Sequence, residues 1–203
     1  MDHHRAGAAS RGAGCGRPSA PGDDPAAAVA RFESGAARMV DVLRAADQDA
    51  VCWTWAPSQQ NIAFITRHQV QEIAVHHWDA VNAIGGELAI EPDIADDAVR
   101  EFLTFSVSSD TDTAPAERGS LPGSFQLRAT DTGTIWHVHS GQKPATVAFE
   151  IADSNGSNEG ADDAEIAATA SDLLLWLYDR VSPDTSAVDA DLLAQFRRLC
   201  YTD

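Results

Sequence analysis

Hydrophobic residues recur at helical spacing in three segments of the first half of the chain. The first, 24–46, opens on Asp24 and Pro25, which suit the N-cap and the first helical position. The second, 58–86, ends at two glycines that can adopt the left-handed conformation of a helix stop. The third covers 94–107. The pattern therefore predicts three helices, the second of them roughly 40 Å long.

Alternation of apolar and polar residues replaces the helical spacing after residue 123, as it does in half-buried strands. Two helices follow: Ser171 can cap a Leu-rich one, and Asp189 can cap a last one that reaches about Cys200. Helices first and a strand meander later predict an α+β fold with a mostly antiparallel sheet and a domain boundary within 90–122. The predicted strands cover 124–130, 134–140, 145–151 and 165–169.

Composition narrows the classes of function. The chain has 203 residues, with 14 Lys or Arg against 31 Asp or Glu, and a formal net charge of −17. Such acidity excludes the clustered basic surface that nucleic acids and anionic lipids require. No apolar run approaches the ~20 residues of a membrane helix, and no secretory signal is visible. We expect a cytoplasmic protein without nucleic-acid or membrane partners, with a disordered tail over the Gly-, Ala- and Ser-rich residues 1–22.

A polar stripe crosses the second predicted helix. His68, Glu72, His76 and Asp79 are spaced 4, 4 and 3 residues apart, so they lie on one helix face. Glu72 and His76 could direct a carboxylate oxygen and an imidazole nitrogen at one metal ion. A catalytic zinc site usually has three protein ligands, so this pair is part of a site. His68 can hardly join His76 on one ion, because eight residues span roughly 12 Å.

Other interpretations of these residues stay open. Glu72 and His76 can equally form a helical ion pair or hydrogen bond. His137 and His139 share a strand face, but no acidic or cysteine partner is near them in sequence, which disfavours a metal site there. The three tryptophans of the helical half are interpreted as packing residues, because a nucleic-acid platform would need basic neighbours. These are Trp53, Trp55 and Trp78.

The stretch WTWAPSQQNIAFITRHQVQEIAVHHWDAVNAIGG resembles the W-x-W…R-x-Q-x-x-E-x-x-x-H-x-W-D-A segment of the mycothiol-dependent maleylpyruvate isomerase family, within the DinB-like metal-binding bundles of actinobacteria. Further along, LRATDTGTIWHV, ASDLLLWLYDR and VDADLLAQFRRL are similar to the α+β, sterol-carrier-like C-terminal domain of that family. The resemblance implies a partial DinB-like helical bundle over 23–92 and a sterol-carrier-like domain over 93–203.

The resemblance also implies a function. In that family a divalent metal, usually zinc, is held by a His on an earlier helix and by the Glu and His of the E-x-x-x-H helix. Glu72 and His76 match the second and third ligands. Arg67 and Asp79 match recurring polar positions, which along with His68 could support the site, and Arg180 matches the arginine that closes the Leu-rich helix and could bind a substrate carboxylate. Mycothiol and a small-molecule substrate are the implied partners.

The chain departs from the family at its start. The first two bundle helices, with the first His ligand, would precede residue 24, where this sequence has its Gly/Ala/Ser tail. Two amphipathic helices alone would expose their apolar face. Three explanations follow: the gene start is misplaced, two chains pair as a homodimer that completes a four-helix bundle, or a separate partner supplies the missing helices.

Three functions are consistent with these observations. The first is a metal-dependent isomerase or S-transferase that uses a thiol. The second is a non-catalytic binding or regulatory protein of the same fold, which an incomplete metal site would favour. The third is a truncated reading frame without a function of its own. Family membership by itself does not assign a reaction.

Overall fold

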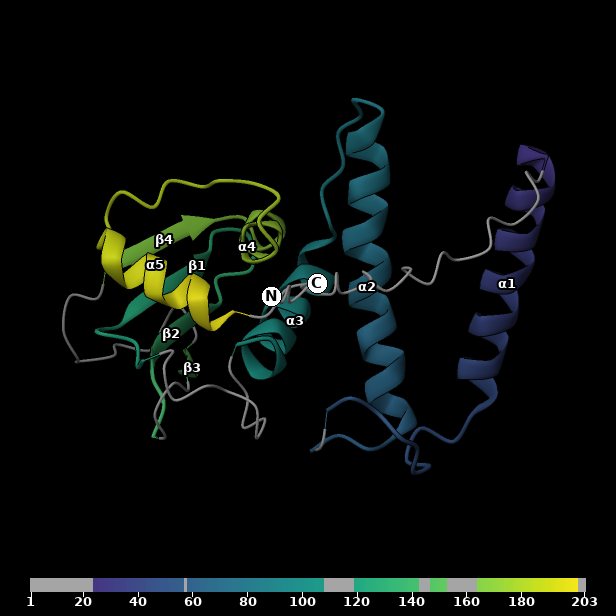
Figure 1. Cartoon of the computed structure of the whole chain (residues 1–203), viewed down its shortest axis with the longest axis horizontal. Coiled ribbons are helices and arrows are strands. Elements are labelled where there is room, and N and C mark those ends of the chain that lie inside the picture. The colour runs from purple at the N-terminus through teal and green to yellow at the C-terminus, as the bar shows by residue number, and fades with distance from the viewer. Residues whose placement is uncertain (1–23, 57, 108–118, 143–146, 153–163, 201–203) are drawn as a thin grey trace, which may run out of the picture. The chain divides into compact units, whose positions relative to one another are not determined.

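The computed structural model describes residues 24–56, 58–107, 119–142, 147–152 and 164–200. The predicted disordered tail, 1–22, lies outside the described residues, as do residues 108–118 within the region 90–122 that is predicted to hold the domain boundary. The chain divides into two compact units, Met1–Asp47 and Gln48–Asp203. Within the described residues there are five helices and one four-stranded sheet, with three helices before the strands (Figure 1). The predicted α+β fold is confirmed, whereas the domain boundary at residue 92 stays a prediction.

The first unit contributes one helix, α1, Pro25–Ala45. Its start is the predicted one, because the Asp24 side chain accepts a hydrogen bond from the backbone N–H of Ala26 and Pro25 occupies the first turn. The apolar stripe that predicts this helix is present, but no residue of α1 is buried. Phe32, in the middle of the stripe, is among the exposed large hydrophobic residues.

Helix α2, Ile62–Ala83, begins later than predicted. Ser58 does not start it, because the residues after Cys52 fold as a loop in which the Gln60 amide donates to the backbone carbonyls of Thr54 and Ala56 at 3.0 and 2.8 Å. The N-cap is Asn61, whose side chain accepts from the backbone N–H of Phe64 at 2.9 Å. The predicted end is confirmed: Gly85 has a φ of +74°, the left-handed conformation that glycine favours.

Three further helices pack in the second unit: α3, Pro92–Phe105, α4, Ala170–Leu177, and α5, Ala190–Leu199. The cap of α5 is Asp189, as predicted. The prediction that Ser171 caps α4 is wrong, because the Thr169 hydroxyl accepts from the backbone N–H of Asp172. The Ser171 hydroxyl instead accepts from the backbone N–H of Ile90 at 3.0 Å, so it ties α4 to the segment that precedes α3.

The sheet has the order β3-β2-β1-β4, with β1 antiparallel to β2, β2 antiparallel to β3 and β1 parallel to β4. Two of its three pairings are thus antiparallel, as predicted. The turn between β1 and β2 contains Gly133, whose φ is +79°. The bounds of the strands are Phe125–Ala129 for β1, Ile135–Ser140 for β2, Val147–Ala152 for β3 and Ala164–Ala168 for β4.

The hydrophobic core lies between one face of the sheet and the helices of the second unit. Alternate residues of β1 are buried, and Phe125 meets Phe196 of α5, which crosses this face, edge to face at 5.1 Å between ring centroids (Figure 1). Phe102 of α3 and Val75 of α2 belong to the same core. Helix α2 is therefore anchored to the sheet-bearing part of the unit by apolar packing.

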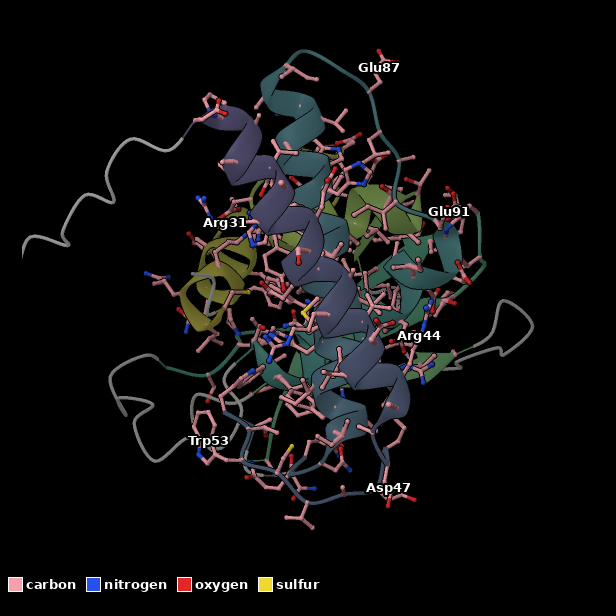
Figure 2. All side chains as sticks on the ribbon, turned by 90° about the vertical axis from the view of Figure 1, so that its right-hand side faces the viewer. Arg31, Arg44, Asp47, Trp53, Glu87 and Glu91 are labelled. Atoms are coloured by element: carbon pink, nitrogen blue, oxygen red, sulfur yellow. The ribbon has the colours of Figure 1, made fainter. Side chains whose placement is uncertain are left out.

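The tryptophans of the loop before α2 differ in their surroundings. Trp55 packs as predicted, with its ring against those of Phe64, His68 and Phe105. Trp53 does not pack: it is 83% exposed and stands at the loop surface in Figure 2. The prediction of packing is wrong for Trp53, because the aromatic cluster at this end of α2 forms with Trp55, which is itself 44% exposed.

Candidate functional site

The predicted polar stripe of α2 is present and lies beside the buried edge of the helix. The Glu72 Oε2 and His76 Nε2 atoms are 3.4 Å apart, one helical turn from each other. The Glu72 side chain is 37% exposed and that of His76 is 64% exposed. The two groups therefore converge on one point at an accessible surface of the helix.

The separation of these two donors fits one bound ion. A tetrahedral zinc ion with ligands at about 2.0–2.1 Å places any two of its donor atoms about 3.4 Å apart. Glu72 and His76 already have this spacing without a change of rotamer. The same distance also suits a hydrogen-bonded pair, so the geometry is compatible with both interpretations of the sequence.

The second nitrogen of His76 contacts a carboxylate. His76 Nδ1 lies 3.1 Å from Asp79 Oδ2. Hydrogen bonding from Arg180 lowers the pKa of Asp79, so this carboxylate is ionised and can only accept. His76 Nδ1 is consequently the donor, and in the neutral ring the lone pair is on Nε2, facing Glu72. A carboxylate behind a ligand histidine is the usual support of a metal-binding imidazole.

Arg180 lies three residues after the last residue of α4 and reaches α2. Its Nε donates to Asp79 Oδ1 at 2.9 Å and its Nη2 donates to Asp79 Oδ2 at 2.8 Å. The Nη1 atom donates to the backbone carbonyl of Tyr178 at 2.8 Å. Hydrogen bonding to Asp79 raises the pKa of Arg180. Because all three nitrogens of the guanidinium are engaged, the contacts of Arg180 fit a supporting role better than the binding of a substrate carboxylate.

His68 faces a different partner. Its Nδ1 lies 2.7 Å from Glu101 Oε1 of α3, whereas its Nε2 lies 3.7 Å from Glu72 Oε1. Glu101 is only 2% exposed, and the hydrogen bond between the two groups raises the pKa of His68. Arg67 also turns to α3, where its Nε donates to Asp97 Oδ2 at 2.7 Å. Both residues thus join α2 to α3 next to the Glu72–His76 pair.

Some of the residues that contact the predicted site residues were not predicted from the sequence. Glu101 has a sequence signal, since it stands three residues after Ala98 and one before Phe102 on the buried face of α3, where a carboxylate needs a partner. Gln71 of α2 is buried and its amide nitrogen donates to the Tyr178 hydroxyl. Burial raises the pKa of Tyr178. The contact between Gln71 and Tyr178 has no local signal, because 107 positions separate them.

In the described part of the chain, no group of three or more His, Cys, Asp or Glu side chains is placed to hold a metal ion. A metal site built on Glu72 and His76 would therefore have only these two protein donors among the described residues. His137 is buried in β2, and His139 contacts the backbone carbonyl of Ser140 through Nδ1 at 3.0 Å. Among the described helices none combines the length and the apolarity that crossing a bilayer demands.

Comparison with known proteins bears on the first part of the chain. Residues 1–81 match the family model described as mycothiol maleylpyruvate isomerase N-terminal domain. The match includes Glu72, His76 and Asp79 and ends before Arg180. No curated protein and no solved structure matches the chain. The first 81 residues of the chain, which include the Glu72–His76 pair on α2, are thus similar to the N-terminal domain of the mycothiol maleylpyruvate isomerase family.

Proposed function

We propose that this cytoplasmic protein binds a divalent metal, most simply zinc, through Glu72 and His76, and that it works as a thiol-dependent isomerase or S-transferase with mycothiol as cosubstrate. One observation carries the proposal. The two donor atoms lie 3.4 Å apart within the segment that matches the family. That spacing is the one that two ligands of a tetrahedral ion adopt.

The residues around the pair suit this role. When bound, a divalent metal supplies Lewis acidity and stabilises a thiolate. Glu72 and His76 would hold it, while Asp79 keeps the His76 proton on Nδ1 and so leaves Nε2 with its lone pair. The exposure of the His76 side chain leaves room for further ligands and for a substrate beside the ion. Substrate identity is not specified by these residues.

We further propose that a second copy of the chain supplies the remaining ligands. Two donors make a weak site, and a symmetric dimer would bring a second Glu72–His76 pair to the same ion. The surface of α2 near the stripe supports this, because Ile73, three residues before His76, is a large apolar residue that stays exposed. A homodimer would bury it within a four-helix bundle.

A non-catalytic protein of the same fold is the alternative. The observation that favours it is the two-ligand set in the described residues, which would bind metal weakly if nothing completes it. Such a protein would keep the polar network for stability, and would use its surface for a binding or regulatory role.

Metal binding separates these functions. Isothermal titration of the metal-free protein with Zn²⁺ should give saturable binding, and His76→Ala should weaken it by more than the roughly 10–100-fold typical of losing an outer partner. The matched control is His77→Ala, since His77 is also exposed but points about 100° away around the helix. Equal zinc affinity in all three proteins would contradict the proposal.

Activity then distinguishes an enzyme from a binding protein. Turnover that requires both a thiol and metal, and that disappears in His76→Ala but not in His77→Ala, is the result expected of an isomerase or S-transferase. Metal content far below one zinc ion per two chains after purification with zinc present would favour the non-catalytic alternative.

A further inference from the structure

We propose that Arg180 is a positioning residue for His76, acting through Asp79 to fix the proton on Nδ1 and the direction of Nε2. The effect of Arg180 on zinc affinity rests on the proposed function, whereas its effect on the tautomer of the His76 ring does not. The proposal links the end of α4 to the candidate ligand on α2, two places 101 or more positions apart in sequence.

The first step is the fork between Arg180 and Asp79. Two guanidinium nitrogens bind the two carboxylate oxygens at 2.9 and 2.8 Å, which fixes both the position and the plane of the carboxylate. Asp79 Oδ2 is shared, because it accepts from Arg180 and also lies 3.1 Å from His76 Nδ1. A carboxylate without the fork could rotate away from the imidazole, so the Arg180 contact determines what His76 meets.

The second step is the anchoring of Arg180 itself. Its Nη1 donates to the Tyr178 carbonyl at 2.8 Å, and its guanidinium carbon lies 5.4 Å from the centre of the Tyr178 ring. The Tyr178 hydroxyl in turn accepts from the Gln71 amide of α2, five residues before His76. The residues after α4 therefore contact α2 at two points, Asp79 and Gln71. Arg180 is fixed by its contacts with Tyr178 as well as by Asp79.

The third step concerns the imidazole. His76 has a carboxylate on each side, Asp79 at Nδ1 and Glu72 at Nε2. A neutral ring can donate to only one of them. Because Asp79 is fixed and is the nearer carboxylate, the ring keeps its proton on Nδ1 and donates it to Asp79 in a hydrogen bond. Nε2 is then unprotonated on the side of Glu72, as a metal ion shared with Glu72 requires. Without Arg180 the proton can move to Nε2, which lies 3.4 Å from Glu72 Oε2. A proton on Nε2 would stand where the ion would bind.

Nitrogen-15 NMR of the metal-free protein tests this at alkaline pH, where imidazoles are neutral. His76→Ala identifies the His76 signals. The wild-type ring should be mainly the Nδ1–H tautomer, and Arg180→Met should shift it to a mixture or to Nε2–H, with partial rescue in Arg180→Lys. Unchanged His76 signals in a folded Arg180→Met protein would overturn the proposal.

A matched control separates positioning from the loss of any ion pair. Arg128 of β1 forms a similar fork with Glu165 of β4, at 2.9 and 2.8 Å, whereas the ion-pair partners of His76 are Glu72 and Asp79 of α2. Arg128→Met should leave the His76 tautomer unchanged; a shift there equal to that in Arg180→Met would also overturn the proposal. Should Arg180→Met fail to fold, Asp79→Ala tests the same contact by removing the acceptor at Nδ1, and an unaltered Nδ1–H ring in that variant would likewise overturn the proposal.

Zinc titration distinguishes this inference from the proposed function. Arg180→Met should bind Zn²⁺ roughly 10–100-fold more weakly than wild type, as losses of outer partners do, while Arg128→Met should not. A tautomer shift in a protein whose wild type binds no zinc would support the positioning role and reject the metal site. Unchanged zinc affinity together with an unchanged tautomer would reject the positioning role and leave the metal site standing.

Discussion

A buried carboxylate sets the charge of His68. Glu101 is 2% exposed and lies on the core-facing side of α3, where an ionised group without a partner would be costly. Arg67 Nε lies 3.4 Å from Glu101 Oε2, and His68 Nδ1 donates a hydrogen bond to Oε1 at 2.7 Å, which raises the pKa of His68 above its ordinary value. The Coulombic attraction of Glu101 and Glu72 acts in the same direction, against the desolvation of the ring.

Stability should therefore depend on pH through His68. Because the folded pKa is raised, the stabilisation is complete below the ordinary imidazole pKa near 6.5 and is lost as pH rises through the folded value. We expect His68→Gln to lose about 1.5–3 kcal/mol of unfolding free energy relative to wild type in mildly acidic solution, the usual contribution of a charged hydrogen bond, and less in alkaline solution.

Urea denaturation of the metal-free wild type and His68→Gln, in mildly acidic and in alkaline solution, measures the difference in unfolding free energy at each pH. The exposed His77 provides the control, since His77→Gln should change stability little at either pH. A destabilisation by His68→Gln that is equal at both pH values would show that the pair contributes without a change in the charge of His68.

The start of α2 is decided at the scale of the element. Ser58 and Asn61 are both residue types that favour an N-cap, and only the fold of the preceding loop selects between them. The Gln60 side chain donates to Thr54 and Ala56, which holds the chain in a loop through residue 60. Asn61 then provides the oxygen that accepts the Phe64 N–H.

Replacing the two candidate caps should have unequal effects. Asn61→Ala should lower the free energy of unfolding by about 1 kcal/mol, because it leaves the Phe64 N–H without its side-chain acceptor. Ser58→Ala should leave stability nearly unchanged, and Asn61→Asp should retain the cap. Thermal or urea denaturation checks all three. Equal stability of Asn61→Ala and wild type would show that this cap contributes nothing to α2.

At the scale of the whole molecule, each of the two units has large apolar helix residues that its own packing does not bury. In α1 the exposed apolar residues include Phe32, and in α2 they include Ile73, which is 53% exposed. Neither residue belongs to the core of the second unit, to which α2 contributes Val75. Exposed apolar helix faces of this kind are typical of surfaces that another chain covers.

The proposed homodimer gives a prediction at this scale. Sedimentation at micromolar concentration should show a dimer that binds one zinc ion per two chains. Ile73→Glu should shift it toward monomer, because a charge would be buried on the outward face of α2. Ile84→Glu is the control, since Ile84 is 85% exposed and follows the last residue of α2. A well-folded wild-type monomer that saturates with one zinc ion per chain would reject the dimer.

Local sequence patterns were sufficient to predict most of the helices and strands, and the residues that α2 contributes to the candidate site. Helical spacing places His68, Glu72, His76 and Asp79 on one face, and strand alternation predicts all four strands to within a few residues. These features depend on backbone periodicity, which neighbouring residues determine. The family of the N-terminal region is likewise readable from contiguous motifs, and the match over residues 1–81 confirms it.

Only the tertiary structure decided the partners of those residues. Local sequence patterns do not predict which groups these side chains contact, because each contact joins residues that are far apart in sequence. The contacts are His68 with Glu101, Asp79 with Arg180, and Gln71 with Tyr178. It also decided which of two suitable caps begins α2. The physical reason is that periodicity orients a side chain relative to its own helix, whereas the packing of α2 against α3 and the end of α4 selects the groups that it meets.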